Sequence, residues 1–379
     1  MLRIGITGQS GFIGTHLYNT LSLAKDKYSS IPFKDEYFES FTDMEEFVSK
    51  CDVIVHLAAM NRHPDPNVIY ETNIKLVQYL ITAMESTNSS PHILFSSSIQ
   101  EDLDNLYGAS KKEGRRLLAE WAKRNNSKFT GFLIPNVFGP FGIPYYNSVI
   151  ATFSYQLSHG ETPKVDIDGT LSLIYVDQLI GEVMKMIDIK DSGNPPVEAV
   201  SNHEMAPTAK EKVSKILEIL SGFKEDYLLH GRIPSLSTPF EMKLFNTFVC
   251  FIDHSEYFPY MLENHSDNRG SFVEVIRLMS GGQVSFSTTK PGITRGNHFH
   301  TRKAERFAVI KGKAKIELRR IGTDKKMTFL LDGQSPSFVD MPIWHTHNIT
   351  NIGDEDLYTI FWINEHFNPD DPDTFFEEV

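Results

Sequence analysis

The first half of the chain alternates short apolar runs with segments whose apolar residues recur every three to four positions. The runs predict buried parallel strands, and the recurrence predicts amphipathic crossover helices between them. Strands are expected at 3–7, 53–57, 92–97 and 129–134, and helices at 68–85 and 110–124. This alternation is typical of a doubly wound, Rossmann-type α/β sheet.

The pattern changes after SGNPPV at residues 192–197. A helical stretch at 208–220 is expected to close the first domain, and no strong periodicity follows up to about residue 250. Beyond residue 270, short strands with turn signals are predicted at 283–288, 305–310, 313–319, 337–340 and 358–364. Because no long amphipathic helix interrupts them, we predict an all-β sandwich or barrel. The domains are placed at residues 1–247 and 248–379.

Composition narrows the class of protein. A length of 379 residues favours two cores, and the net charge of -12 disfavours nucleic acid and anionic membranes as main partners. Cys51 and Cys250 are far apart in sequence and are interpreted as reduced thiols. With no leader-like segment or membrane-length apolar run, the chain is expected to be cytoplasmic. The acidic stretch 368–373 is interpreted as a solvated tail.

Three glycines, Gly8, Gly11 and Gly14, lie between the first predicted strand and a helix. Glycines there let the backbone turn tightly and approach a pyrophosphate at the helix N-terminus. Their spacing differs from the ordinary dinucleotide fingerprint, so alone they would also suit a simple tight turn.

Tyr107 and Lys111 strengthen this interpretation, because residues four apart share one face of a helix. A neighbouring cation would lower the pKa of the phenol from about 10 toward a useful range. Tyr107 could then protonate a carbonyl oxygen while hydride reaches the carbon. A hydroxyl from the upstream serine run would orient the carbonyl, and we prefer Ser98 to Ser97.

With these elements in order, residues 1 to about 245 resemble the extended short-chain dehydrogenase/reductase family. The resemblance implies that Ser98, Tyr107 and Lys111 are catalytic and that a nucleotide-sugar substrate lies near Asn136 and Asn147. The expected cofactor contacts are Gly8, Ser10, Gly11, Phe12, Ile13, Gly14, Lys34, Leu57, Ala58, Ala59, Asn73 and Lys111.

Two departures from the family pattern narrow the reaction. Ile99 and Gln100 follow Ser98, where sugar dehydratases of the family carry an Asp-Glu pair, so dehydration is disfavoured. Lys34 follows the second predicted strand, 30–33, and a cation there suits the 2′-phosphate of NADP. Asp35 and Glu36 directly beyond it leave NAD as the alternative.

A second set of chemical groups lies in the C-terminal part. Gly292, His298, His300, Glu305 and Gly312 have the spacing of the first cupin motif. Side chains two apart on a strand point the same way, so both histidines can bind one ion. Three imidazoles and one carboxylate suit Zn²⁺ or another divalent cation.

The fourth ligand is expected from the second cupin motif. His347 has the spacing expected from Pro342 and to Asn351, and we prefer it to its neighbour His345. Trp344 departs from the glycine usual at its position. The domain is thus predicted to be a metal-binding cupin jelly-roll barrel.

Residues 267–274 and 295–298 also resemble the cupin-type nucleotide keto-sugar epimerases. The resemblance implies that Arg269 or Arg295 binds a diphosphate, which guanidinium groups do well. In those epimerases the histidine at the position of His298 is a metal-free base, so the identity of the base is left open.

Over its whole length the chain is similar to the two-domain capsular polysaccharide enzymes of bacterial UDP-N-acetyl-L-fucosamine synthesis. The resemblance implies a homodimer that epimerises C3 of a UDP-4-keto-6-deoxy-N-acetylhexosamine in the cupin. NADPH-dependent reduction at C4 would then give UDP-2-acetamido-2,6-dideoxy-L-talose. One alternative is a plain C4 reductase with a structural or sugar-binding cupin. Another is a metal-dependent sugar-binding or regulatory cupin on a degenerate dehydrogenase.

Overall fold

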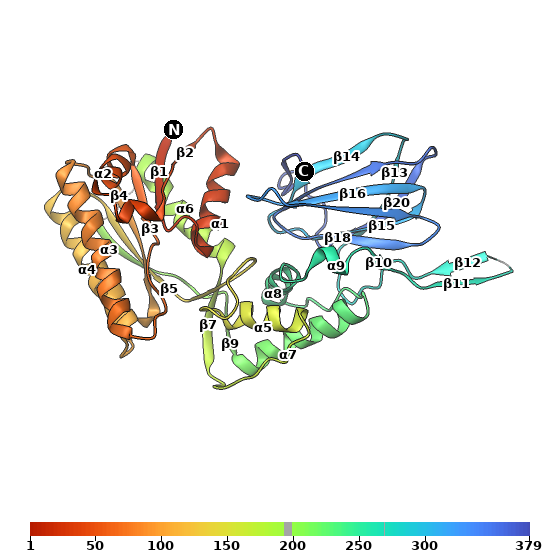
Figure 1. Cartoon of the computed structure of the whole chain (residues 1–379), viewed down its shortest axis with the longest axis horizontal. Coiled ribbons are helices and arrows are strands. Elements are labelled where there is room, and N and C mark those ends of the chain that lie inside the picture. The colour runs from red at the N-terminus through yellow and green to blue at the C-terminus, as the bar shows by residue number, and fades with distance from the viewer. Residues whose placement is uncertain (193–198, 269) are drawn as a thin grey trace. The chain divides into compact units, whose positions relative to one another are not determined.

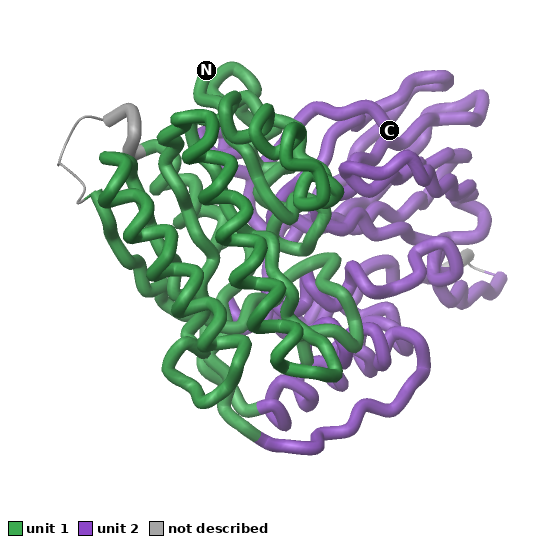
Figure 2. Tube along the Cα trace, turned by 60° about the vertical axis from the view of Figure 1, so that its left-hand side comes forward, with its two compact units in different colours: residues 1–149, 169–212 green, residues 150–168, 213–379 purple. Residues whose placement is uncertain are grey.

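The computed structural model describes residues 1–192, 199–268 and 270–379. The chain forms two compact units, one of Met1–Val149 with Gly169–Lys212 and one of Ile150–Asp168 with Val213–Val379 (Figure 2). This division by contacts does not coincide with the boundary predicted at 247/248, which stays a prediction.

The first unit is built on a six-stranded parallel sheet in the order β2-β1-β3-β4-β5-β8 (Figure 1). Its strands are β1 (Leu2–Thr7), β2 (Tyr28–Ile31), β3 (Val53–His56), β4 (His92–Ser98), β5 (Phe129–Ile134) and β8 (Val200–Glu204). Four of the predicted strands are therefore confirmed to within a residue.

Helices cover both faces of this sheet. Ile4 and Ile6 pack with apolar residues of α1 (Phe12–Leu21) and α6 (Val176–Ser192). On the opposite face Ile93 and Phe95 pack with helices that include α2 (Phe41–Lys50), α3 (Pro66–Ser86) and α4 (Leu106–Arg124). Two buried layers around one sheet make the fold doubly wound, as predicted.

A small sheet completes the first unit and corrects one prediction. It joins β6 (Asn136–Phe138), β7 (Thr170–Tyr175) and β9 (Ala209–Lys212). Residues 209–212 were expected in a helix, but their alternating half-buried and exposed side chains pair antiparallel with β7. Helix α7 (Val213–Phe223) begins only after this strand and belongs to the second unit.

The rest of the helical part of the second unit lies in or directly after the stretch without periodicity, apart from one helix before residue 169. It contains α5 (Val149–Ser158), the π-helix η4 (Lys224–Leu229), α8 (Pro239–Val249) and the short α9 (His254–Tyr257). Helix α8 begins with a local signal that does not depend on periodicity, a capping box in which the side chains of Thr238 and Glu241 accept hydrogen bonds from each other's backbone amides.

Two antiparallel sheets of five strands each form the β part of the second unit, in the orders β10-β18-β15-β20-β13 and β17-β16-β19-β14-β21. The first contains β10 (Tyr260–Met261), β13 (Gln283–Thr289), β15 (Glu305–Lys311), β18 (Ser337–Met341) and β20 (Leu357–Ile363). The second contains β14 (Thr294–Phe299), β16 (Lys313–Arg320), β17 (Lys326–Asp332), β19 (His345–Asn351) and β21 (Phe375–Phe376). Val309, Ile316 and Phe338 are among the residues that pack between the sheets, which confirms the predicted all-β domain.

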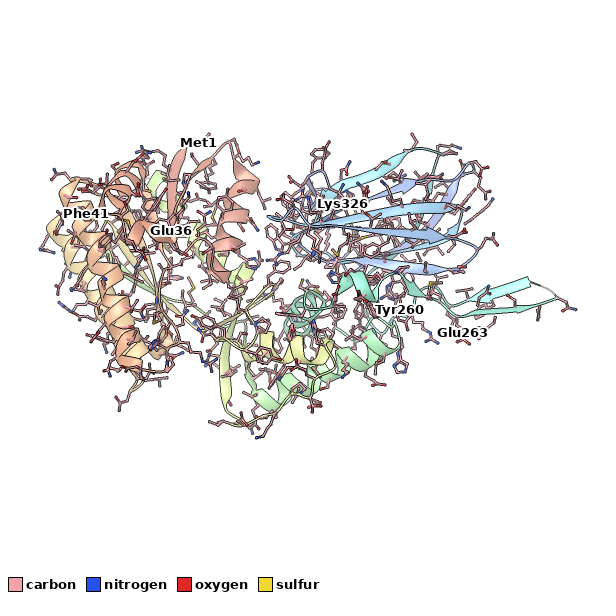
Figure 3. The ribbon with its side chains drawn as sticks, viewed as in Figure 1. Met1, Glu36, Phe41, Tyr260, Glu263 and Lys326 are labelled. Atoms are coloured by element: carbon pink, nitrogen blue, oxygen red, sulfur yellow. The ribbon has the colours of Figure 1, made fainter. Side chains whose placement is uncertain are left out.

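A separate hairpin of β11 (Asn264–Asp267) and β12 (Gly270–Val273) extends from this part of the chain. Figure 3 labels Tyr260 in β10 and Glu263 at the entry to the hairpin. Both cysteines are free, as predicted, and no helix in the described ranges is long and apolar enough to cross a membrane.

The expectation of a solvated tail at 368–373 is wrong for its last residue. Asp373 is only 4% exposed, and its carboxylate accepts hydrogen bonds from backbone amides of the loop after β14. The negative charge satisfies buried N–H donors, so this end of the acidic stretch is part of the folded unit.

Candidate functional site

The glycine turn connects β1 to α1 in the first unit. Gly8 has φ of 71°, and a Cβ on Gly14 would lie 2.3 Å from the Gly8 carbonyl oxygen. The first turn of α1 has no side-chain cap and no acidic residue. Its amide N–H groups are therefore free to bind an anion such as a pyrophosphate.

This turn forms one side of a pocket of about 950 Å³. Most of the residues predicted for cofactor, substrate and catalysis in this unit line it: Gly8, Ser10, Gly11, Phe12, Ile13, Gly14, Leu57, Ala58, Ala59, Ser98, Tyr107, Lys111, Asn136 and Asn147.

Lys34 and Asn73 do not line this pocket. Lys34 lines a neighbouring cavity of about 430 Å³. Asp35 lines both cavities, and its carboxylate accepts a hydrogen bond from Ser10 Oγ at 3.2 Å. Glu36, labelled in Figure 3, directly follows Asp35 and also lines the second cavity. A positively charged residue, Lys34, and a negatively charged residue, Asp35, thus lie together where the cofactor ribose is expected.

Asn73 supports the pocket wall from behind. Its amide group accepts a hydrogen bond from Met60 N at 2.7 Å and donates to Met60 O at 3.0 Å and to Ser110 Oγ at 2.9 Å. These bonds connect α3 to the loop after β3 and to α4. Met60 itself lines the pocket, so Asn73 holds that loop in place.

The serine run at the end of β4 separates into different roles. Ser97 Oγ donates to the buried Glu101 carboxylate, which also receives a bidentate pair from Arg115, with NH2 to Oε2 at 2.6 Å. Ser98 Oγ only accepts a bond from Gln100 N at 3.1 Å, so its proton is free to be donated. This geometry favours Ser98 as the hydroxyl that meets a substrate.

The environment of Tyr107 differs from the expected one. Burial raises its pKa to about 12, so the expectation of a pKa lowered by Lys111 is wrong for this arrangement. The Lys111 ammonium lies 5.9 Å from the Tyr107 ring centroid and donates to the Ser96 carbonyl at 2.9 Å. Burial lowers the pKa of Lys111 itself to about 8.

Sequence reasoning missed three polar groups at this pocket. Gln100 and Arg62 line it, and Arg62 donates to the carbonyls of Tyr145 and Tyr146 at 2.7 and 2.8 Å. Tyr146 also lines the pocket. No spacing rule connects residues 62 and 145, because the chain brings them together only in the folded loops.

The second unit gathers His298, His300, Glu305 and His347, whose nearest ligand atoms all lie within 4.8 Å of one another. His298 lies in β14 and is paired with His347 of β19, while Glu305 begins β15 in the facing sheet. The distances from Glu305 Oε2 to His300 Nε2 and His347 Nε2 are 3.4 and 3.2 Å.

The chemistry of these four groups fits a divalent cation. His300 Nε2, His347 Nε2 and Glu305 Oε2 are buried and have no hydrogen-bond partner. Although burial acts against the charge, the two imidazoles lower the pKa of Glu305, so it is ionised. His300 Nδ1 and His347 Nδ1 face the carbonyls of Asp373 and His345, which leaves each Nε2 lone pair free for a metal.

His345 has a different environment. Its Nδ1 donates to the Ile343 carbonyl at 3.0 Å, its ring packs against His254, and burial lowers its pKa to about 3. The preceding Trp344 has φ of 58°, which explains why glycine is usual at this position. Its ring stacks on Phe299 with centroids 5.6 Å apart.

The two arginines expected to bind a diphosphate are not assigned by the structure. Arg295 is exposed on β14, where its NH1 lies 3.4 Å from the Thr288 carbonyl. Arg269 lies outside the described residues. Substrate binding by either residue stays a prediction.

Comparison with known proteins matches both units. Residues 4–198 match the NAD dependent epimerase/dehydratase family, and residues 265–375 match the polysaccharide biosynthesis C-terminal domain. The chain is 33% identical to UDP-2-acetamido-2,6-beta-L-arabino-hexul-4-ose reductase of Pseudomonas aeruginosa, over 99% of this chain and 98% of that protein. Spore coat polysaccharide biosynthesis protein SpsL of Bacillus subtilis is 28% identical and covers 30% of this chain and 81% of its own length.

Among solved structures, the capsular polysaccharide assembling protein CapF from Staphylococcus aureus is 35% identical, covers 100% of both chains and has a TM-score of 0.63. RMD from Pseudomonas aeruginosa complexed with NADPH is 20% identical, covers 59% of this chain and 84% of its own, and has a TM-score of 0.52. The latter similarity concerns the fold alone.

Proposed function

Since the chain belongs to the NAD dependent epimerase/dehydratase family, in its CapF-like form with a polysaccharide biosynthesis C-terminal domain, we propose that it reduces a UDP-linked keto sugar for capsular polysaccharide synthesis. The name of the Pseudomonas aeruginosa relative, a UDP-linked hexul-4-ose reductase, supports this reaction and points to C4.

One observation carries the proposal. The pocket lined by the glycine turn, where we propose that the cofactor binds, is also lined by Tyr107, Lys111 and Ser98. A nicotinamide cofactor, when bound, supplies the hydride that reaches the carbonyl carbon. Because burial raises its pKa, Tyr107 is a neutral phenol at pH 7 and can give its proton to the carbonyl oxygen.

Lys111 and Ser98 complete the reduction. The Lys111 ammonium stabilises the phenolate that Tyr107 becomes, and Ser98 donates a hydrogen bond to the substrate oxygen. Dehydration lacks a free acid, because Glu101 is held by Arg115 and Ser97, and Gln100 cannot transfer a proton.

We propose NADPH as the cofactor. Lys34 lines the cavity beyond Ser10, and its cation suits a 2′-phosphate. Asp35 favours the free ribose hydroxyl of NADH instead. Comparing Lys34→Ala with the parent tests the choice, since this change should lower the NADPH-over-NADH ratio of kcat/KM.

For the second unit we propose C3 epimerisation of the same UDP-4-keto-6-deoxy-N-acetylhexosamine. The 4-keto group acidifies the C3 proton, and a divalent cation such as Zn²⁺, when bound, would stabilise the enolate oxygen. His298, His300, Glu305 and His347 would hold the ion. Reduction at C4 then fixes the new configuration and gives UDP-2-acetamido-2,6-dideoxy-L-talose.

A homodimer and a cytoplasmic location are proposed by similarity to this family of capsule enzymes. Asn136 and Asn147, which line the pocket, are proposed to contact the sugar nucleotide.

Feeding the purified protein this keto sugar with NADPH in deuterated water tests both halves. We expect NADPH oxidation and one deuterium at C3 of the product. Reduction without deuterium at C3 would select the plain C4 reductase with a structural or sugar-binding cupin. Absence of NADPH and NADH oxidation with this and related keto sugars would overturn the proposed function.

A further inference from the structure

The segment 371–378, here called the closing segment, adds a strand beside the metal-ligand strand β14. In β21, Phe376 pairs with His298 and Phe375 pairs with Phe299. Glu377 N also donates to the Asn297 carbonyl at 3.0 Å. A segment remote in sequence is thus hydrogen-bonded to the strand that carries the first ligand.

Asp373 anchors the closing segment to the loop that follows His300. Its carboxylate accepts bonds from Thr301 N at 3.1 Å, Thr301 Oγ1 at 2.6 Å, Arg302 N at 3.0 Å and Lys303 N at 3.1 Å. The residue is 4% exposed and has φ of 43°. Asp373 therefore satisfies three backbone donors of one turn from inside the protein.

Further contacts tighten the same junction. Lys303 is 2% exposed, and its Nζ donates to the Pro372 carbonyl at 2.9 Å. The Phe375 ring stacks on Phe299 with centroids 5.4 Å apart. The position of the Asp373 backbone is thus determined from both sides.

This junction acts on His300 through one bond. His300 Nδ1 lies 2.5 Å from the Asp373 carbonyl oxygen, which can only accept. Nδ1 must then carry the proton, so the Nε2 lone pair is free and points toward Glu305. For His347 the corresponding acceptor is His345 of its own strand, whereas His300 depends on a residue 73 positions away.

We propose that Asp373 is a positioning residue for the metal ligand His300, fixing its tautomer and ring orientation through the closing segment. This inference rests on the proposed metal binding by the second unit. It identifies a group that neither cupin motif contains.

The test measures Zn²⁺ affinity of the full-length protein by chelator competition, together with the absorption spectrum of the Co²⁺-substituted protein. Asp373→Ala should weaken Zn²⁺ binding by about 10–100-fold and alter the Co²⁺ spectrum. Asp373→Asn, which keeps one acceptor oxygen and tolerates a positive φ, should lose less. The matched control Asp370→Ala removes an exposed carboxylate of the same stretch and should bind Zn²⁺ like the parent.

The outcomes separate the two ideas. If Asp373→Ala and Asp373→Asn bind Zn²⁺ as tightly as the parent with an unaltered Co²⁺ spectrum, the positioning role is wrong while the metal site stands. If the parent binds neither ion, the proposed metal site itself fails. A role in folding alone would lower the melting temperature of the Asp373→Asn protein and leave its Co²⁺ spectrum unchanged, which also overturns the inference.

Discussion

The Lys111 ammonium donates a hydrogen bond to the backbone carbonyl of Ser96 across 2.9 Å. The bond connects α4 to the end of β4, two residues before Ser98. The ammonium lies 5.9 Å from the centroid of the Tyr107 ring. Burial raises the pKa of Tyr107 to about 12, so the phenol stays protonated, which is the state that a reductase needs before the proton is transferred.

Replacing Tyr107 with Phe removes this proton donor without changing the shape of the pocket. We expect reduction of the keto sugar, followed as NADPH oxidation, to fall by about 10²–10⁴-fold. Exchange of the C3 proton with deuterated water should continue, because we propose that the second unit carries it out. The control Tyr79→Phe changes a tyrosine of α3 outside the pocket lining and should leave both reactions intact; loss of exchange in Tyr107→Phe would contradict separate sites.

The pH dependence of reduction should report Lys111. Burial lowers its pKa from 10.5 to about 8, so the stabilising ammonium is present below pH 8 and is lost as the pH rises through that value. We expect kcat/KM for the keto sugar to decline above about pH 8, while Tyr107 remains protonated. Lys111→Met should be slow at every pH and lack this limb, and a variant that kept the limb would show that another group titrates.

The residues proposed for reduction could be grouped from the sequence because their geometry is local. Tyr107 and Lys111 are one helical turn apart, and the glycine turn lies within seven consecutive residues. The Ser97–Glu101–Arg115 cluster was not predictable, since its members come from a strand end, a short turn and a helix. The pKa of Tyr107 was misjudged for the same reason, because burial depends on the whole fold.

In the second unit, spacing gave the four predicted metal ligands, and the fold brings them together. The strands β14 and β19 that carry His298 and His347 were not predicted as elements, because their glycine, asparagine and histidine residues hide any apolar alternation. In the sequence, Asp373 belongs to an acidic stretch with two prolines, which is typical of a solvated tail. Only the turn at 301–303 reveals why a carboxylate is buried there.

Gly14→Ala tests the cofactor turn. The added methyl would lie 2.3 Å from the Gly8 carbonyl oxygen and 2.8 Å from Gln9 Cα, and backbone atoms cannot yield as a flexible side chain can. We expect NADPH binding, measured by fluorescence titration, to be lost or strongly weakened. Gly181→Ala on α6 is the control, because its methyl meets nothing within 4 Å and alanine favours the helix by about 0.5–1 kcal/mol.

The choice between neighbouring histidines can be tested by metal analysis. His347→Ala should lose stoichiometric Zn²⁺, because its Nε2 faces Glu305 at 3.2 Å. His345→Ala should retain the ion and lower the melting temperature, since its ring packs against His254 and its Nδ1 bonds the Ile343 carbonyl. Retention of Zn²⁺ by His347→Ala and its loss in His345→Ala would reverse the assignment.

Arg306 of β15 makes a buried ion pair with Asp340 of the neighbouring strand β18. Its Nε and NH2 donate to the two carboxylate oxygens at 2.7 and 2.9 Å, and its NH1 donates to the Gly231 carbonyl at 2.6 Å. Because Arg306→Met leaves the Asp340 charge buried without its main partner, we expect unfolding free energy to fall by about 3–5 kcal/mol.

Chemical denaturation of Arg306→Met, Asp340→Leu and the double variant measures this loss and divides it between the partners. The double variant should be more stable than Arg306→Met alone, since no unpaired charge remains in the interior. The control is Lys311→Ala, also on β15, which removes an exposed ion pair with Glu355. It should show no measurable loss of unfolding free energy. If the Arg306→Met variant were as stable as the parent, water would have to reach Asp340. The ion pair would then not stabilise the connection between β15 and η4 that the hydrogen bond from Tyr227 to Asp340 indicates.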